Sequence, residues 1–231
     1  MHVVDDNPWN SLTPTGWTMR GGGSGKLAIG SDASAPASPS SVLQFKYPAG
    51  FSGSGSAPGS EYFTGFDSSK ELFVAFDWKV SADWQQHTAG FSKLIYLVHC
   101  SYCNTTSQPG GRIAYVMMMQ GHFGGPYHLM MNDEIYNTNK IQPNVGDGTV
   151  VPGRWYRVEI SVKGQSTSGA NDGWIKFWID GRPVAQYLNL PIPSRGFTQL
   201  TIDPVWGGVD PTISKTHTDY MWFDHIHVSA R

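Results

Sequence analysis

Hydrophobic and polar residues alternate in short runs along most of the chain, with the period of two that places successive side chains on opposite faces of a strand. No segment keeps helical periodicity for three turns. The pattern predicts nine strands in the last two thirds of the chain, at Glu71–Val80, Phe91–His99, Arg112–Gln120, Tyr127–Asn132, Trp155–Lys163, Trp174–Ile179, Pro183–Tyr187, Gln199–Pro204 and Tyr220–Ser229. Two strand-like islands, KLAIG and SVLQFKYP, precede them, and Asp180-Gly181 is typical of a tight hairpin turn.

The last predicted strand, in DYMWFDHIHVSAR, has an unusual mixture of side chains. Strict alternation assigns one face to Tyr220, Trp222, Asp224, Ile226 and Val228, and the other to Met221, Phe223, His225 and His227. The first face is apolar apart from the carboxylate of Asp224. The second face presents two imidazoles on the same side.

These elements predict an all-β fold, an antiparallel two-sheet β-sandwich that forms a single domain over residues 1–231. Residues 21–60 are dominated by Gly, Ser, Ala and Pro. Because strand-like islands interrupt this segment and only about twenty residues precede it, we interpret it as long loops of one sandwich rather than a linker.

Composition narrows the classes of partner. Only 15% of the 231 residues are charged and the formal net charge is -2, so no global basic field would hold nucleic acid or an anionic membrane surface. No apolar run approaches membrane-spanning length, and the first residues lack the pattern of a signal peptide. The Gly/Ser/Thr/Asn-rich, Lys-poor composition favours a mature secreted protein, and we expect a monomer.

Several segments resemble a known family. GRWYRVEISVKG, DGWIKFWIDGRPV, DPVWGGV and DYMWFDHIHVS look like the C-terminal half of a concanavalin A-like jelly roll, and ELFVAFDWKVSADWQQHTAGFSK resembles its middle strand and the loop that follows. The version they resemble occurs in bacterial polysaccharide lyase-like and glucanase-like extracellular modules. The resemblance implies a concave sheet along which a glycan chain lies. It covers most of residues 60–231.

Two reaction types are relevant to a polysaccharide. Glycoside hydrolysis needs two carboxylates facing each other, and the Glu-x-Asp-x-x-Glu strand motif of jelly-roll glucanases is absent. A hydrolase with an atypical carboxylate pair from different strands stays open. β-Elimination of a uronic acid instead needs a group that neutralises the sugar carboxylate, a base for the C5 proton and an acid for the leaving oxygen.

The densest set of suitable side chains lies in DWQQHTAGFSK and GRIAYVMMMQGHFGGPYHLMMN. We predict His87 as the base, because an imidazole is partly neutral near pH 7. Tyr127 or Tyr115 is predicted as the acid, with Lys93 as a further catalytic candidate. Candidates for substrate binding are Gln86, Arg112, Gln120, His122 and His128. Gln86 and Arg112 are expected to hold the substrate carboxylate.

Candidate metal ligands lie near both ends of the chain. The resemblance implies a structural calcium (Ca²⁺) on the convex side, with Asp224 matching by position and Asp5 or Asp6 as partners. A buried Asp224 that only accepts hydrogen bonds is the alternative. Cys100 and Cys103 are expected to be bonded to each other or free, because no second cysteine pair completes a zinc site.

The sequence therefore predicts an extracellular protein that acts on polysaccharide, with a lyase that cleaves an acidic polysaccharide as the leading hypothesis. A non-catalytic carbohydrate-binding or adhesion module is the main alternative. A structural or assembly component is a third class.

Overall fold

The computed structural model describes residues 1–21, 25–64, 68–99, 113–122, 124–133 and 141–231. All regular structure in these residues is β. The strands are β1 (His2–Asn7), β2 (Trp17–Arg20), β3 (Leu27–Gly30), β4 (Val42–Tyr47), β5 (Ser52–Ser54), β6 (Ser60–Phe63), β7 (Glu71–Val80), β8 (Phe91–His99), β9 (Ile113–Gln120), β10 (Tyr127–Asp133), β11 (Thr149–Val150), β12 (Tyr156–Lys163), β13 (Gly173–Ile179), β14 (Arg182–Leu190), β15 (Gln199–Ile202), β16 (Val209–Ser214) and β17 (Asp219–Ala230).

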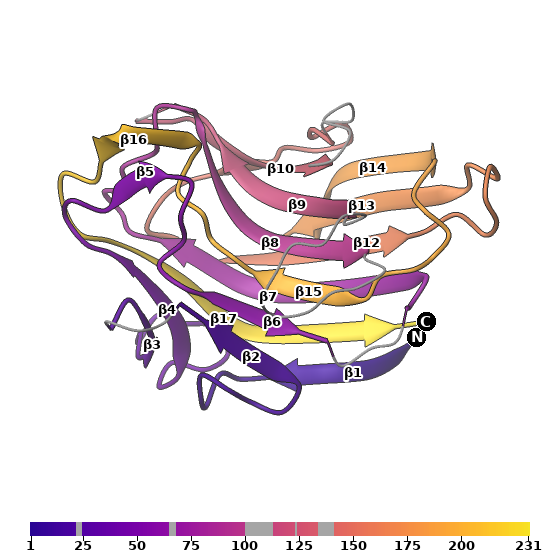
Figure 1. The fold of residues 1–231 in the computed structure, drawn as a ribbon, viewed down its shortest axis with the longest axis horizontal. Coiled ribbons are helices and arrows are strands. Elements are labelled where there is room, and N and C mark those ends of the chain that lie inside the picture. The colour runs from indigo at the N-terminus through magenta and orange to yellow at the C-terminus, as the bar shows by residue number, and fades with distance from the viewer. Residues whose placement is uncertain (22–24, 65–67, 100–112, 123, 134–140) are drawn as a thin grey trace.

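Two large antiparallel sheets pack face to face (Figure 1). The eight-stranded sheet has the order β14-β13-β12-β7-β17-β4-β3, with β1 paired to the end of β17. The seven-stranded sheet has the order β11-β10-β9-β8-β15-β6-β2, and β16 pairs with β5 in a small separate ribbon. The predicted antiparallel sandwich is confirmed. Within the residues that the structure describes, no helix is long and apolar enough to cross a membrane.

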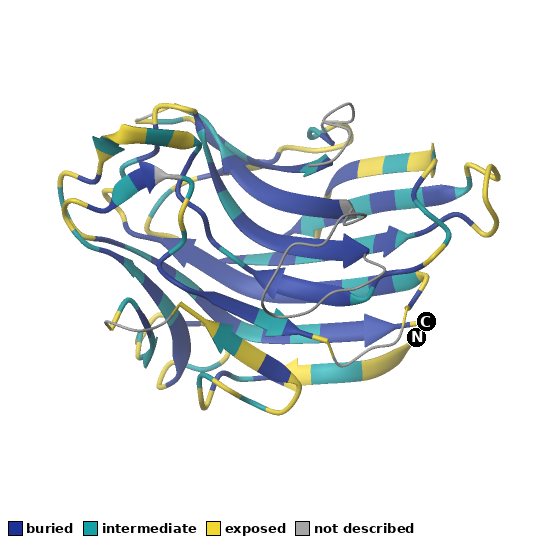
Figure 2. Ribbon diagram, viewed as in Figure 1, coloured by how far each residue is buried: buried dark blue, intermediate teal, exposed yellow. Residues whose placement is uncertain are grey.

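The core lies between the sheets, because each strand turns its apolar positions inward. Leu97 of β8, Met117 of β9, Leu129 of β10 and Leu200 of β15 meet there, opposite Phe223 of β17, and all five are fully buried. Buried residues run along both sheets, while exposed residues gather in the connecting loops and along β1, β14 and β16 (Figure 2). Burial of this apolar surface is the main favourable contribution to folding.

A β-bulge in β17 changes the faces expected for the closing strand. Asp224 pairs with Asp77 and His227 with Ala75, so one extra residue lies on β17, and His225 adopts a φ of 39°. After the bulge, Ile226 and Val228 join the inner face. The predicted grouping of Trp222 and Asp224 with Ile226 and Val228 was therefore wrong, because a one-residue insertion reverses the alternation. His227 lies on the outer face with Trp222 and Asp224.

One carboxylic acid is enclosed without a partner. Glu61 of β6 lies opposite Ile202 of β15 and Met19 of β2, on the inner face. Its side chain is fully buried, and neither carboxylate oxygen has a hydrogen-bond partner. Burial raises the pKa of Glu61 to about 8, because an unpaired charge is strongly disfavoured there. The folded protein consequently keeps Glu61 protonated over a pH range in which the unfolded chain ionises it.

Glu61→Gln is expected to change how stability depends on pH. Between pH about 4.5 and 8 the folded wild type binds more protons at this position than the unfolded chain does, so the contribution of Glu61 to stability falls as pH rises. The variant loses this slope and should gain stability relative to wild type at pH 8, but not at pH 4.5. Urea unfolding across this range measures the difference. Glu159→Gln on β12 is the control, and an equal response from both variants would contradict the assignment.

Candidate active site

Polar side chains from three neighbouring strands meet on the outer face of the seven-stranded sheet. Phe91 of β8 pairs with Gln120 of β9, which pairs with His128 of β10. Two positions along, Lys93 pairs with Met118, which pairs with Met130. Paired residues of adjacent strands share a face, so Gln120, His128 and Lys93 all lie on the side opposite the core. We call these residues, with Gln142, the outer polar set.

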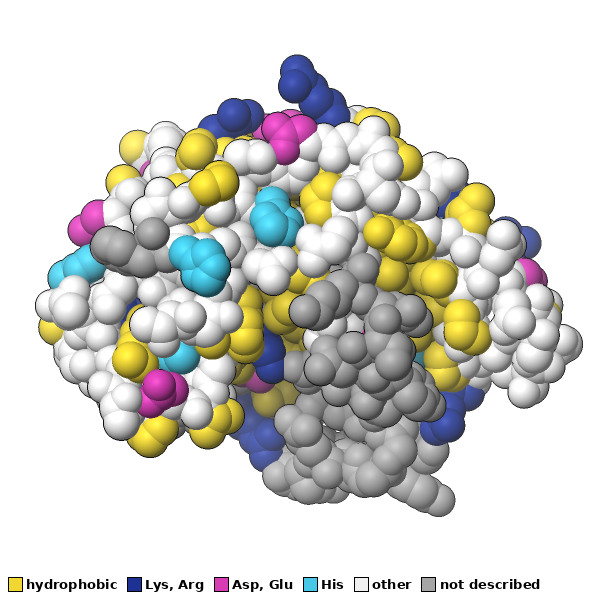
Figure 3. Space-filling model, turned by 90° about the horizontal axis from the view of Figure 1, so that it is seen from above, with side chains coloured by type: hydrophobic (Ala, Val, Ile, Leu, Met, Phe, Trp, Pro, Cys, Tyr) yellow, Lys and Arg dark blue, Asp and Glu magenta, His cyan; other side chains and the backbone are white. Residues whose placement is uncertain are grey.

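The space-filling view shows the side of the molecule that carries β9, β10 and β16 in Figure 1. Histidine and hydrophobic side chains gather there, and the surface is hollowed beside the atoms that are not described (Figure 3).

His128 is oriented by two glutamine side chains. Its Nε2 lies 3.1 Å from Oε1 of Gln120 and 3.0 Å from Oε1 of Gln142. Both atoms are acceptors, so Nε2 carries the proton and donates to them. Nδ1 of the neutral ring then holds a lone pair, and no described residue bonds to it. The arrangement leaves a half-buried imidazole with its basic nitrogen available.

The glutamines are themselves held in place. Nε2 of Gln142 donates to Oε1 of Gln120 at 3.2 Å and lies 3.3 Å from Sδ of Met130. Gln120, His128 and Gln142 therefore form a closed network that fixes the ring orientation.

Lys93 is the only Lys or Arg in strands β8, β9 and β10. Its ammonium lies 5.6 Å from the ring centre of Tyr96, within the range of a cation–π contact. A bulge at Leu94 puts Lys93 and Tyr96 on the same face, although they are three residues apart. Beside them, Met118 and Met130 belong to an apolar cluster on this outer face.

His87, the predicted base, is enclosed instead. Its ring is 1% exposed and lies edge-on to Trp206, with centroids 4.9 Å apart. Nδ1 accepts a hydrogen bond from the backbone N–H of Ala89 at 3.0 Å, and Nε2 is buried against the backbone of Gly53. Burial lowers the pKa of His87, so the ring stays neutral. A side chain with this little exposure does not reach a polysaccharide in this conformation.

Gln86 also serves the fold. Its Oε1 accepts from Oγ of Ser92 at 2.5 Å and from Nε1 of Trp84 at 3.3 Å, and its Nε2 donates to the carbonyl of Met119 at 3.2 Å. Only 3% of Gln86 is exposed. These bonds fasten the loop between β7 and β8 onto the seven-stranded sheet. The amide predicted to hold a substrate carboxylate is thus occupied within the protein.

The two tyrosines predicted as acids lie on the inner side. Tyr115 of β9 contacts the rings of His99 and Phe197, with centroids 6.2 and 6.4 Å away. Tyr127 of β10 packs in the core, where its hydroxyl accepts from the N–H of Gly124 at 3.2 Å. Burial raises the pKa of Tyr127. Neither ring shares a face with the outer polar set, because alternation turns both toward the other sheet.

Of the remaining predicted residues, the structure brings Gln120, His128 and Lys93 to one face. His122 is exposed on the turn that follows β9. Arg112, Cys100 and Cys103 lie outside the described residues. Sequence reasoning missed Gln142 and Tyr96. Gln142 lies outside the predicted strands, so alternation along the sequence does not point to it. Regular alternation places Tyr96 on the face opposite Lys93, and only the bulge at Leu94 brings the two side chains onto one face.

The residues predicted to bind calcium point to different partners. Oδ2 of Asp224 accepts the backbone N–H groups of Ala37 and Ser38, at 2.8 and 2.9 Å. Asp5 accepts from Nε1 of Trp17 at 2.8 Å, while Oδ1 of Asp6 lies 2.8 Å from Nε2 of His225. Asp5 and Asp6 thus do not form a ligand set with Asp224 among the described residues. Calcium binding at Asp224, whose Oδ1 is buried without a partner, stays a prediction.

The chain folds as a jelly-roll sandwich. The outer face of β8, β9 and β10 carries the outer polar set beside an apolar cluster, a surface suited to an extended polar ligand. A family model for polysaccharide lyases matches residues 58–226. The chain belongs to this polysaccharide lyase family, which confirms the predicted class. No curated protein sequence matches it.

Solved structures with the same fold cover nearly the whole chain. A marine alginate lyase from Aplysia kurodai is 13% identical with a TM-score of 0.70, and each chain covers 100% of the other. A mutant alginate lyase in complex with alginate trisaccharide is 14% identical, with a TM-score of 0.68 and coverage of 98% of this chain and 97% of that one. An endo-β-1,4-glucuronan lyase from the fungus Trichoderma reesei is 17% identical, with a TM-score of 0.66 and coverage of 99% and 96%. At these identities the likeness establishes the fold.

Substitution at Gly207 tests the enclosure of His87. A Cβ at Gly207, where φ is +75°, would lie 1.9 Å from Cγ of His87. A Cβ at Gly181, with a φ of +72°, would meet nothing within 4 Å. Both alanine variants bear the strain of positive φ, so their difference isolates the clash. Gly207→Ala should lower the free energy of unfolding by about 1–3 kcal/mol more than Gly181→Ala, measured by urea titration. Equal losses would mean that His87 has room to move.

Proposed function

We propose that the chain cleaves a uronate-containing polysaccharide by β-elimination on the outer face of β8, β9 and β10. The observation that carries this proposal is the His128–Gln120–Gln142 network, which presents an oriented imidazole whose Nδ1 has no hydrogen-bond partner among the described residues. The membership of a polysaccharide lyase family supports it. The nearby Lys93 supplies the positive charge that an acidic sugar requires.

His128 is assigned as the base. Its Nδ1 removes the proton at C5 of the uronate, and the electron pair left behind forms a C4=C5 double bond as the C4–O bond to the neighbouring sugar breaks. The two amide oxygens on Nε2–H stabilise the imidazolium that forms, because its positive charge faces acceptor dipoles. The imidazolium then returns the proton to the departing glycosidic oxygen. Atoms and electrons balance without a co-reactant.

Lys93 is assigned to the substrate carboxylate. An ammonium beside that carboxylate favours removal of the C5 proton, because it offsets the negative charge that develops on the sugar in the transition state. Lys93 lies two strands and two register positions away from His128, with β9 between them. Strand spacing of about 4.8 Å and a rise of about 3.3 Å per residue put their backbones roughly 12 Å apart, a gap that a sugar unit and a long lysine side chain can bridge.

The relatives indicate which substrates to test first. Two of the structures with the same fold are named as alginate lyases and one as a glucuronan lyase. Both polymers carry a carboxylate on every sugar, which the assignment of Lys93 requires. We accordingly propose a polyuronate as substrate and an extracellular location, where such polymers are found. A monomer remains the expected state.

His128→Ala is expected to lose about 10²–10⁴-fold in kcat on a polyuronate while keeping substrate affinity, because a general base contributes roughly that much. The unsaturated product absorbs in the near ultraviolet, so turnover is followed directly, and affinity electrophoresis measures binding. His225→Ala, on the other sheet, is the matched control and should keep full activity. Wild-type protein that binds polyuronates but never generates the unsaturated product would establish a binding module instead.

Lys93→Ala distinguishes the role proposed for Lys93 in binding the substrate carboxylate from the role of His128 as the base. It should raise KM as well as lower kcat, because the ammonium contacts the substrate carboxylate in both ground state and transition state.

His87→Ala should lower the stability of the fold, with activity per folded molecule largely retained. If His87→Ala abolishes turnover in a folded protein while His128→Ala does not, the proton is transferred near Trp206 and the assignment of His128 as the base is wrong.

A further inference from the structure

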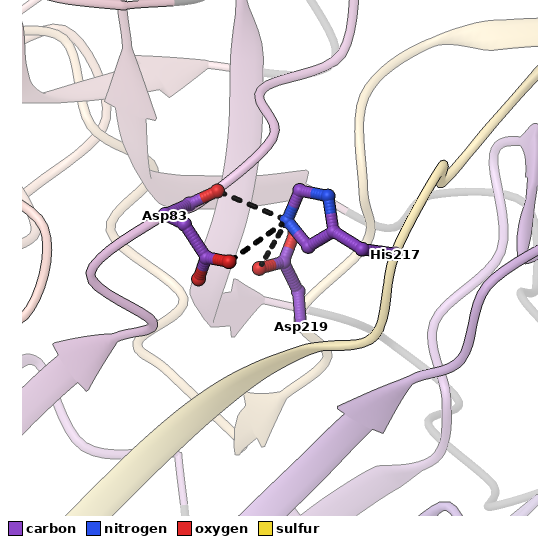
Figure 4. Close-up of side chains that lie close together, drawn as sticks. All are labelled: Asp83, His217 and Asp219. Carbon is purple, nitrogen blue, oxygen red and sulfur yellow. Dashed lines mark hydrogen bonds and ion pairs between the residues drawn. The ribbon is translucent and has the colours of Figure 1, made fainter.

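A cluster of side chains of metal-ligating types lies where the loop after β7 meets the start of β17. Asp83 follows β7, His217 lies in the turn before β17, and Asp219 is the first residue of β17. Their ligand atoms all lie within 4.8 Å of one another. In Figure 4 the imidazole of His217 points between the two carboxylates.

The imidazole nitrogen of His217 lies farther from the two carboxylates than in a direct hydrogen bond. Nε2 of His217 lies 3.5 Å from Oδ2 of Asp83 and 3.3 Å from Oδ1 of Asp219. It lies 3.0 Å from the backbone carbonyl oxygen of Asp83. Ligands at about 2.0–2.2 Å from a tetrahedral zinc ion are separated from each other by roughly 3.3–3.5 Å. The two carboxylate distances match that separation.

Both ring nitrogens of His217 face oxygen atoms of the protein. The hydroxyl of Thr216 donates to Oε1 of Gln85 at 3.0 Å, since a carbonyl oxygen only accepts. Oγ1 of Thr216 is then left to accept from Nδ1 of His217, 3.3 Å away. The carbonyl of Asp83 also only accepts, so Nε2 is the donor in its 3.0 Å contact when no ion is bound. Both ring nitrogens thus face acceptors, and a metal ion on Nε2 would take the place of that proton while Nδ1–H donates to Thr216.

A buried carboxylate oxygen also favours a cation here. Asp219 is fully buried, and its Oδ1 has no hydrogen-bond partner. Its Oδ2 is occupied by the ammonium of Lys215 at 2.5 Å and by the N–H of Gln85 at 3.0 Å. Among the described residues, Lys215 pairs with Oδ2 of Asp219 and leaves Oδ1 facing only His217. An orphaned carboxylate oxygen in this position is costly unless a cation completes it.

We propose that Asp83, His217 and Asp219 bind one divalent transition-metal ion, with Zn²⁺ as the fitting member of that class. An imidazole with two carboxylates suits zinc, whereas Ca²⁺ takes oxygen ligands. Thr216 acts behind the ligand as the group that orients the ring. The ion would join the turn after β7 to the turn before β17. It has no part in the elimination, because none of its ligands lies on β8, β9 or β10.

Binding is tested on chelator-treated, dialysed protein. Zinc at about 100 times its Kd should raise Tm by roughly 5–10 °C, because a ligand that binds only the folded state stabilises it. Isothermal titration should give one equivalent. Cobalt(II) offers a spectroscopic signature, since its visible absorption reports coordination by the protein.

Two variants and one control identify the ligands. His217→Ala should abolish the zinc-dependent shift, and Asp83→Asn, at an exposed side chain, should weaken it without unfolding the protein. His225→Ala is the matched control, because His225 and His227 with Asp6 form the other histidine–carboxylate group in the described part of the chain. Zinc binding that survives His217→Ala, or is lost in His225→Ala, overturns the proposal.

A proton is the competing occupant. If His217 is simply an imidazolium held between two carboxylates, zinc leaves Tm unchanged in the wild type, and that result also overturns the proposal. Turnover on polyuronates is measured separately. A failed zinc site therefore leaves the assignment of His128 untouched, and a failed lyase assay does not affect the zinc titration.

Discussion

The core between the two sheets decides which side chains can meet a ligand. Every strand of the seven-stranded sheet must turn one face to that core, and only the alternate residues reach the other face. Met117 and Met119 of β9 fill the interior, whereas Met118 and Gln120 lie outside. The outer polar set is therefore a consequence of packing, because an inward polar residue must either find partners inside the sandwich or, like Glu61, stay buried without them.

Bulges modify this rule at the two places that matter most for interpretation. The extra residue at Leu94 lets Lys93 and Tyr96 share the outer face, and the one at His225 moves Ile226 and Val228 into the core. Each insertion reverses the alternation for the rest of its strand, so one bulge can overturn several assignments. The His225 bulge also sets the buried carboxylate of Asp224 on the outer side, under the backbone of Ala37 and Ser38.

The strands and their antiparallel arrangement could be predicted, because period-two alternation and the Asp180-Gly181 turn are local signals. Short strands such as β2, β6 and β16 were not, since each forms by pairing with distant residues. The residues of the candidate site were likewise predictable only in part. Density of titratable groups pointed to the strands that carry the outer polar set and included Gln120, His128 and Lys93, but it could not distinguish exposed from enclosed members. The burial of His87 depends on Gly53, Gly207 and Trp206, which are remote in sequence.

The contrast between His87 and His128 shows which surroundings suit an imidazole to catalysis and which suit it to a structural role. His87 lies against an indole, with one ring nitrogen satisfied by a backbone N–H and the other buried against the backbone of Gly53, so burial keeps it neutral and inaccessible. His128 is half-buried, and two amide oxygens define its tautomer from one side, while no residue in the described ranges bonds to the other nitrogen. A base needs both an accessible lone pair and a neighbour that tolerates the charge it gains. His128 meets both conditions among the described residues, and for this reason we place the proposed reaction at the amide network rather than at His87.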